Sequence, residues 1–151
     1  MNISDLVHRR EPSMRKKMYA EHVYTYIQKY IKSKNKGDLD LEYTPIIKLP
    51  ENLNFVNGSL DLSYSTIEHL NSNLQIKVSL DLMYTPLKKL PENLRIGKNL
   101  YISNSNISKL PTSLRICGKI FCKNSTFQKK HSTIDIKFLQ SLFNCEIITS
   151  I

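Results

Sequence analysis

One pattern of apolar residues recurs five times between Leu39 and Phe127, and it restricts the fold more than any other feature of the chain. Each unit opens with two apolar residues that flank a third, in the segments Leu39-Asp40-Leu41, Leu60-Asp61-Leu62, Leu80-Asp81-Leu82, Leu100-Tyr101-Ile102 and Ile120-Phe121-Cys122. The segments begin at residues 39, 60, 80, 100 and 120, so the period is 20 or 21 residues. Self-similarity at a fixed period of about 20 to 50 residues indicates a solenoid of stacked repeats.

The alternation within each segment predicts a short β-strand, because successive side chains of a strand point to opposite faces. A repeating unit returns to the same place one strand further on, so the strands should stack in parallel, about 4.8 Å apart. We call the segment that leads from the end of one strand back to the start of the next the return leg. It contains Leu49-Pro50, Leu90-Pro91 and Leu110-Pro111, whereas the second unit has Leu70-Asn71. Proline breaks a longer helix, so this leg should be extended or form a single 3₁₀ turn.

The full unit reads L-x-L-x-x-[ST]-x-[IL]-x-x-L-P-x-x-L-x-I and is complete over residues 80–96. This pattern resembles the leucine-rich repeat family. The resemblance implies an α/β solenoid of about five repeats, each of 20–21 residues, with a short-stranded parallel sheet. The repeats are also similar to those of type III secreted ubiquitin-ligase effectors of bacteria and of short phage and viral proteins. The effectors carry a large catalytic domain in addition, so the resemblance is to their repeats alone.

A short hydroxyl side chain follows each strand, at the position where many leucine-rich repeats carry a buried asparagine. The five residues are Thr44, Ser65, Thr85, Ser105 and Ser125. A hydroxyl can bond the backbone of the adjoining bend and so satisfy polar groups that the bend leaves unpaired. We therefore expect these hydroxyls to take the role of the asparagine.

The chain divides into a basic N-terminal segment with a capping helix (1–36), the repeats (37–131) and a C-terminal cap (132–151). Ser13 is the expected N-cap of the first helix, and Gly37 the expected residue after its C-terminus. The apolar face of this helix should cover the first repeat and comprises Tyr19, Val23, Tyr26, Ile27, Tyr30 and Ile31. The C-terminal cap should contain a short helix and a last strand after Asn144, with apolar surface from Ile134, Ile136, Phe138, Leu139, Leu142 and Phe143.

Stacking turns equivalent exposed positions into columns on the concave face of the sheet. The middle strand position carries Asp40, Asp61, Asp81, Tyr101 and Phe121, and the bend after it carries Glu42, Tyr43, Tyr64, Met83 and Tyr84. Aspartates about 4.8 Å apart repel by roughly 1 kcal/mol per pair in water, and a cationic partner would relieve that repulsion. These residues predict a non-catalytic module that binds a basic or mixed-charge protein surface, as an inhibitor or an adaptor. The alternative is that the aspartates only reflect duplication of one repeat.

A second hypothesis is nucleic-acid binding through the basic side of the first helix. Of the formal net charge of +9, residues 1–36 supply +6, from 9 Lys+Arg against 3 Asp+Glu. The candidate residues are Arg9, Arg10, Arg15, Lys16 and Lys17, and the convex face would add Lys48, Lys88, Lys89, Arg95, Lys109 and Arg115. Few exposed aromatic residues lie beside those lysines to stack on bases, so protein binding is the preferred hypothesis.

The sequence predicts no enzyme, no metal site and no cofactor. The four histidines are scattered, and the four glycines form no phosphate-binding loop. A flat ladder of carboxylates converges on no single point for a metal. Three cysteines, an odd number, fit neither a disulfide framework nor a zinc site, which favours a reducing, cytoplasmic location. No run of about 18 apolar residues indicates a membrane span, and no apolar N-terminal stretch indicates a secretory signal.

Overall fold

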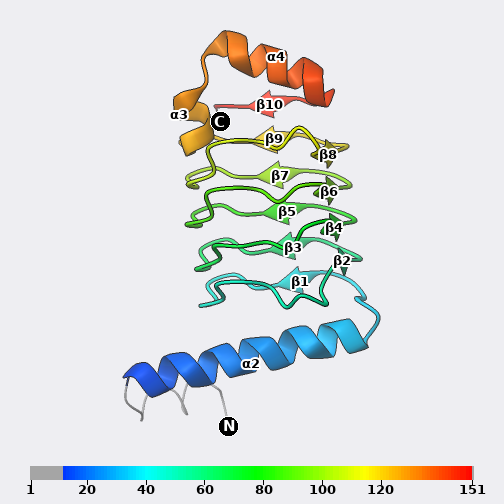
Figure 1. The fold of residues 1–151 in the computed structure, drawn as a ribbon, viewed down its shortest axis with the longest axis vertical. Coiled ribbons are helices and arrows are strands. Elements are labelled where there is room, and N and C mark those ends of the chain that lie inside the picture. The colour runs from blue at the N-terminus through cyan, green and yellow to red at the C-terminus, as the bar shows by residue number, and fades with distance from the viewer. Residues whose placement is uncertain (1–11, 151) are drawn as a thin grey trace.

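Short turns of about 20 residues stack into a column between two helical ends (Figure 1). The computed structural model describes residues 12–150, with side chains from residue 19 onward. Helix α2 (Pro12–Lys32) lies across one end, and helices α3 (Thr126–Lys130) and α4 (Thr133–Phe143) lie at the other. This confirms the predicted parallel solenoid with a helix at its N-terminal end and a helical cap at its C-terminal end. The predicted basic segment before Pro12 lies outside the described residues.

Each turn contributes one strand to a six-stranded parallel sheet whose order follows the sequence. The strands are β1 (Leu39–Asp40), β3 (Leu60–Asp61), β5 (Leu80–Asp81), β7 (Leu100–Tyr101), β9 (Ile120–Phe121) and β10 (Ile147–Ile148). Leu39 is paired with Leu60, and Leu60 with Leu80, so equivalent residues of successive repeats lie side by side. The columns inferred from the sequence are therefore real columns in the folded chain.

A second parallel sheet, which the sequence analysis did not predict, runs along the return legs. Its four strands are β2 (Phe55–Val56), β4 (Gln75–Ile76), β6 (Arg95–Ile96) and β8 (Arg115–Ile116). The return leg is thus extended, which is one of the two forms expected from its proline. The second residue of each pair points inward, and Val56, Ile76 and Ile96 are buried.

The two sheets enclose stacked columns of leucine and isoleucine. Leu39, Leu60, Leu80 and Leu100 are fully buried, and burial of each such side chain stabilises the fold by about 1.5–3 kcal/mol relative to an exposed one.

The five hydroxyl residues Thr44, Ser65, Thr85, Ser105 and Ser125 are buried too, and we call them the hydroxyl ladder. Each donates its hydroxyl to the carbonyl oxygen three residues earlier, at 2.6 to 2.7 Å. This confirms that the hydroxyls satisfy the backbone of the bend.

Helix α2 covers the first turn with Val23, Ile27 and Tyr30, as predicted. The Tyr30 hydroxyl lies 2.9 Å from the carbonyl oxygens of both Asn35 and Gly37 and accepts the N–H of Asn57 at 3.3 Å. The assignment of Tyr26 to this face was wrong, because its side chain is 45% exposed. One residue step turns an α-helix by about 100°, which carries Tyr26 away from the buried stripe centred on Ile27.

The ends of α2 also correct the sequence analysis. The helix includes Pro12, and proline is favoured in the first turn, so Ser13 is not its N-cap. The helix ends at Lys32 and is closed by Lys34, which has a φ of +61°. The N–H of Asn35 donates to the Tyr30 carbonyl at 3.1 Å, which is the pattern of a Schellman motif. Gly37 lies further on, in the turn that leads into β1.

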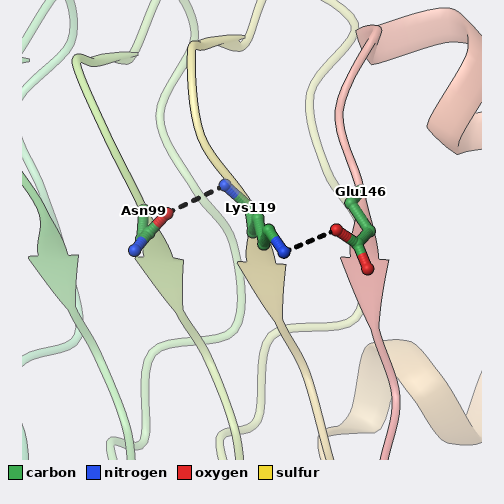
Figure 2. A network of polar contacts seen from close by, with 3 residues as sticks. All are labelled: Asn99, Lys119 and Glu146. Carbon is green, nitrogen blue, oxygen red and sulfur yellow. Dashed lines mark hydrogen bonds and ion pairs between the residues drawn. The ribbon is translucent and has the colours of Figure 1, made fainter.

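The predicted last strand is confirmed as β10, which pairs with β9 at the far edge of the sheet. Figure 2 shows the polar contacts just before these strands. The ammonium group of Lys119 lies 2.8 Å from the carboxylate of Glu146, and the Lys119 backbone N–H donates to Asn99 Oδ1 at 3.0 Å. The last strand is thereby fastened to its neighbour by a side-chain pair as well as by backbone hydrogen bonds.

Helix α4 packs on the last turn through Ile136, with Leu139 and Phe143 partly buried beside it. A capping box of Ser132 and Asp135 begins the helix. Three of the six apolar residues that were expected to supply the surface of this cap do not pack on the repeats. Ile134, Phe138 and Leu142 are 51 to 79% exposed, because they follow one another at four-residue spacing on the outer side of the helix.

Candidate protein-interaction face

The outer face of the six-stranded sheet carries the predicted column of aspartates. Asp40 lies beside Asp61, Asp61 beside Asp81, and Asp81 beside Tyr101. Each aspartate accepts the backbone N–H of the residue two positions later, at 2.9 to 3.0 Å. These carboxylates therefore hold the bend after each strand, which is a structural role in addition to any role in binding.

Three tyrosines beyond this column form a stacked row that we call the tyrosine ladder, consisting of Tyr43, Tyr64 and Tyr84. The ring centroids of Tyr43 and Tyr64 lie 4.7 Å apart at an interplanar angle of 17°. Those of Tyr64 and Tyr84 lie 4.4 Å apart at 11°. The side chains remain 42 to 64% exposed, so the first three turns present a continuous aromatic surface.

The backbone of the tyrosine ladder is in the left-handed region, with φ of 56 or 57° at all three residues. Asn104 and Asn124 take the same conformation, at 56°, in the fourth and fifth turns. Asparagine enters this region readily, whereas most side chains raise the energy by about 1–2 kcal/mol there. Every turn thus requires a residue in the left-handed conformation at this bend. The first three turns place a tyrosine there, for which this conformation is unfavourable.

The aromatic surface changes its position in the last two turns. Tyr101 and Phe121 occupy the strand position of the aspartates, and their rings stack at 4.8 Å and 12°. Asn99 donates its side-chain N–H to the Tyr101 hydroxyl at 3.0 Å. Glu42 lies in the bend after β1 and is exposed, and Met83 lies in the bend after β5 and is half-buried. All ten residues predicted for protein binding therefore belong to the strands of this sheet or to the bends that follow them.

Negative charge is concentrated at the N-terminal end of this face. Burial, followed by the neighbouring Asp61 and Glu42, raises the pKa of Asp81 to about 6, although the N–H of Met83 opposes the shift. Carboxylate oxygens of Asp40, Glu42 and Asp61 lie within 4.8 Å of one another. Such an exposed acidic group does not by itself define a metal site, since the ion needs six or more oxygens to replace its water.

The residues of the nucleic-acid hypothesis are only partly described. Arg9 and Arg10 lie outside the described residues, and Arg15, Lys16 and Lys17 lie in α2, where the structure describes the backbone alone. The convex lysines are exposed on the return legs, in the half of each turn that follows the tyrosine ladder. The hypothesis of nucleic-acid binding stays a prediction.

The side chains of Cys122 and His131 each lie against a backbone carbonyl group. The Cys122 thiol is buried directly after β9 and lies 3.4 Å from the Ile148 carbonyl oxygen. Burial raises the pKa of this thiol to about 11, which leaves little thiolate at neutral pH. His131 Nδ1 lies 2.8 Å from the Phe127 carbonyl oxygen, and its ring packs on Phe127 at 4.4 Å. Cys122 is thus a buried thiol of the hydrophobic core.

Sequence reasoning missed the left-handed backbone under the tyrosine ladder. The signal was present in the aligned repeats, because Asn104 and Asn124 stand where the first three units have tyrosine.

Comparisons of the chain with models of protein families, with curated proteins and with solved structures gave no match. None of the helices in the described part of the chain combines the length and hydrophobicity needed to span a bilayer.

Proposed function

We propose that this chain is a leucine-rich-repeat protein and acts as a non-catalytic protein-binding module. The repeat pattern, the parallel turns of 20 residues and the hydroxyl ladder support the family assignment. The binding surface is the outer face of the six-stranded sheet, centred on the tyrosine ladder and the aspartate column. Binding there inhibits the partner by covering its surface, or recruits it as an adaptor.

The tyrosine ladder is the observation that carries this proposal. Three tyrosines in the left-handed conformation destabilise the fold by about 1–2 kcal/mol each. The two stacked contacts between their rings offset only about 0.5–1.5 kcal/mol each. The fold is served equally well by asparagine, which holds the same φ at Asn104 and Asn124. Exposed aromatic residues that are rigidly held against the preference of the backbone are typical of binding surfaces.

A basic partner surface complements this face. An arginine or lysine side chain can lie over a tyrosine ring while its charge approaches Asp40, Glu42 or Asp61. A cation bound there stabilises the ionised form of Asp81, so the affinity should fall as the pH is lowered through about 6. Neutral and acidic surfaces gain no such stabilisation.

The test replaces the tyrosine ladder by the residue that the later turns use, in the triple variant Tyr43→Asn, Tyr64→Asn and Tyr84→Asn. Its melting temperature should equal or exceed that of the parent, because asparagine fits the backbone. Proteins that an immobilised parent chain retains from lysate are identified, and the purified partner is titrated calorimetrically against both chains. The triple variant should bind at least about tenfold more weakly. Tyr24→Ala with Tyr26→Ala, two exposed tyrosines of α2, is the matched control.

Two results would move the function elsewhere. A purified partner that binds the parent and the triple variant equally would remove the sheet face from the interaction. Nuclease-sensitive retention, with an affinity that falls steeply as salt is raised, would favour the nucleic-acid hypothesis.

A further inference from the structure

A groove with a volume of about 730 Å³ lies between the return legs of the second and third turns. Its lining residues follow strands β3 and β5 and the bends after them in the chain. None of its lining residues belongs to the aspartate column or to the tyrosine ladder. The groove is therefore a surface of its own, and we call it the basic groove after its lining residues Lys88, Lys89 and His69.

An interruption in the backbone hydrogen bonds marks this place. Elsewhere along the edge, the N–H groups of Thr66, Asn106 and Thr126 donate to the preceding turn at 3.1 to 3.3 Å. The equivalent residue of the third turn is Pro86, which has no N–H. Within the described structure no backbone hydrogen bond joins residues 66–70 to residues 86–90. The second and third turns are thus unconnected along the groove.

The second turn is fastened to the first turn instead. The N–H groups of Glu68 and His69 both donate to the Ile47 carbonyl, at 2.8 and 3.2 Å. Asn71, which replaces the proline of the other return legs, donates its side-chain amide to the carbonyl oxygens of Pro50 and Leu53, each at 2.8 Å. The donors of the second return leg thus bond to the first turn, and Pro86 has no N–H with which to bond the third turn to the second.

Hydrogen-bond donors are concentrated where the second and third turns share no backbone hydrogen bond. The backbone N–H groups of Lys88 and Lys89 have no backbone acceptor in the described structure. Their side chains line the same groove, and Glu68 is the one carboxylate among the lining residues. Backbone N–H groups beside ammonium groups are the donors that anionic oxygens accept. Leu70, Leu90 and Pro91 add apolar surface to this donor set.

We propose that the basic groove binds an acidic peptide segment of a partner protein. Its carboxylates pair with Lys88 and Lys89, and an apolar side chain enters between Leu70 and Leu90. A peptide fits better than a nucleic acid because no phenylalanine, tyrosine or tryptophan lines the groove, and the single imidazole of His69 offers no row of rings on which successive bases could stack. The volume lies in the range of about 300–1,000 Å³ that is typical of sites for small ligands, so a few residues fill it. This site is independent of the function proposed for the sheet face.

The probe is a fluorescein-labelled hexapeptide of alternating glutamate and leucine, titrated against the whole chain by fluorescence anisotropy. Binding should be saturable, and about tenfold weaker in the double variant Lys88→Gln and Lys89→Gln. The matched control is Lys77→Gln with Lys98→Gln, which removes the same charge from exposed lysines that do not line the groove. The control and the triple tyrosine variant should both keep the parental affinity.

A second variant tests the open edge without changing any charge. Pro86→Thr supplies an N–H where Thr66 and Thr126 supply theirs, and the acceptor at the equivalent position of the preceding turn is the Ser65 carbonyl. The restored bond should draw the turns together and weaken peptide binding severalfold. The proposal is overturned by the absence of saturable binding, by equal losses in the two lysine pairs, or by undiminished binding to Pro86→Thr. Displacement of the peptide by a lower concentration of single-stranded oligonucleotide would overturn it as well.

Discussion

A single left-handed residue after each strand serves both the backbone and the surface of this protein. Its φ is the same within 1° in all five turns, whether the side chain is tyrosine or asparagine. In the first three turns, two neighbouring residues stabilise this bend. The strand aspartate accepts the backbone N–H of Glu42, Ser63 or Met83, and the residue after the left-handed position donates its hydroxyl to a backbone carbonyl. The side chain at the left-handed position is consequently free to be chosen for contact with a partner.

The carboxyl group of Asp81 should make the stability depend on pH. Its pKa is about 6 in the folded chain, chiefly because of burial, against an ordinary value of 3.8. Between these values the folded state binds more protons than the unfolded state, so the free energy of unfolding falls as the pH rises from about 4 to about 6. Asp81→Asn keeps an acceptor for the Met83 N–H and should raise the melting temperature at pH 7.5 while flattening this slope.

Thermal melts of the parent and of Asp81→Asn between pH 4 and 8 measure this effect. Glu51→Gln, on an exposed return leg, removes one carboxylate and is the control. A slope that survives Asp81→Asn unchanged would assign the pH dependence to other groups.

The hydroxyl ladder should contribute measurably to stability. Ser105 is buried and donates to the Ile102 carbonyl at 2.7 Å. Ser105→Ala leaves that carbonyl with only the longer bond from the Ser105 backbone N–H, at 3.3 Å, and should lower the free energy of unfolding by about 0.5–1.5 kcal/mol. Urea denaturation measures the change, with the exposed Thr112→Ala expected to stay within about 0.5 kcal/mol. Equal effects of the two substitutions would contradict a role for the buried hydroxyl.

At this scale the sequence predicted the columns well, because the period of 20 residues and the alternation within each strand decide which side chains share a face. It did not predict the backbone angles of Tyr43, Tyr64 and Tyr84, since tyrosine normally avoids the left-handed region. Nor did it predict the role of Pro86, because a missing N–H matters only when the turns are known to pair at that residue.

At the scale of secondary-structure elements, the two helical caps show what the spacing of apolar residues can predict. The spacing of Val23, Ile27 and Tyr30 predicted the covering face of α2, and only Tyr26 was assigned to the wrong side. In α4 the apolar residues surround much of the helix, so sequence alone could not separate the buried Ile136 from the exposed Phe138. The second sheet escaped prediction because β4, β6 and β8 each contain a single apolar residue, whereas every strand of the first sheet predicted from the repeats opens a pair of apolar residues that flank a third.

Tyr30 should be the most sensitive position of the N-terminal helix. Its hydroxyl joins α2 to the turn at Asn35 and Gly37 and to Asn57 of the next return leg. Tyr30→Phe keeps the ring but removes these contacts, and should destabilise the fold by about 1–3 kcal/mol in urea denaturation. Tyr26→Phe makes the same chemical change on the exposed side of the helix and should be nearly neutral. Destabilisation by both would point to helix propensity instead.

The molecule as a whole is a stack in which each strand pairs only with its neighbours in the sheet. Stability should therefore be close to a sum of terms for single turns and for the contacts between adjacent turns. The strict register, with Leu60 beside Leu80 and Leu80 beside Leu100, makes complete turns interchangeable units.

Removal of one complete turn should give a shorter but folded protein. Deletion of residues 80–99 joins Ser79 to Leu100 and places Leu100 beside Leu60 in the register that Leu80 held. The variant should melt cooperatively at a lower temperature, as followed by circular dichroism, because one layer of core is lost. Deletion of residues 80–89 cuts a turn in half and should abolish the cooperative transition. A folded half-turn variant would contradict the additive description.

The positions that face outward on the six-stranded sheet share no residue with the leucine and isoleucine columns inside it. A library that varies only the left-handed residue and the middle strand residue of every turn would therefore leave the interior untouched. Since one backbone already accommodates both tyrosine and asparagine, such a library should yield folded members at high frequency. The chain can thus serve as an engineering scaffold whose recognition surface is rewritten turn by turn and lengthened by inserting further turns.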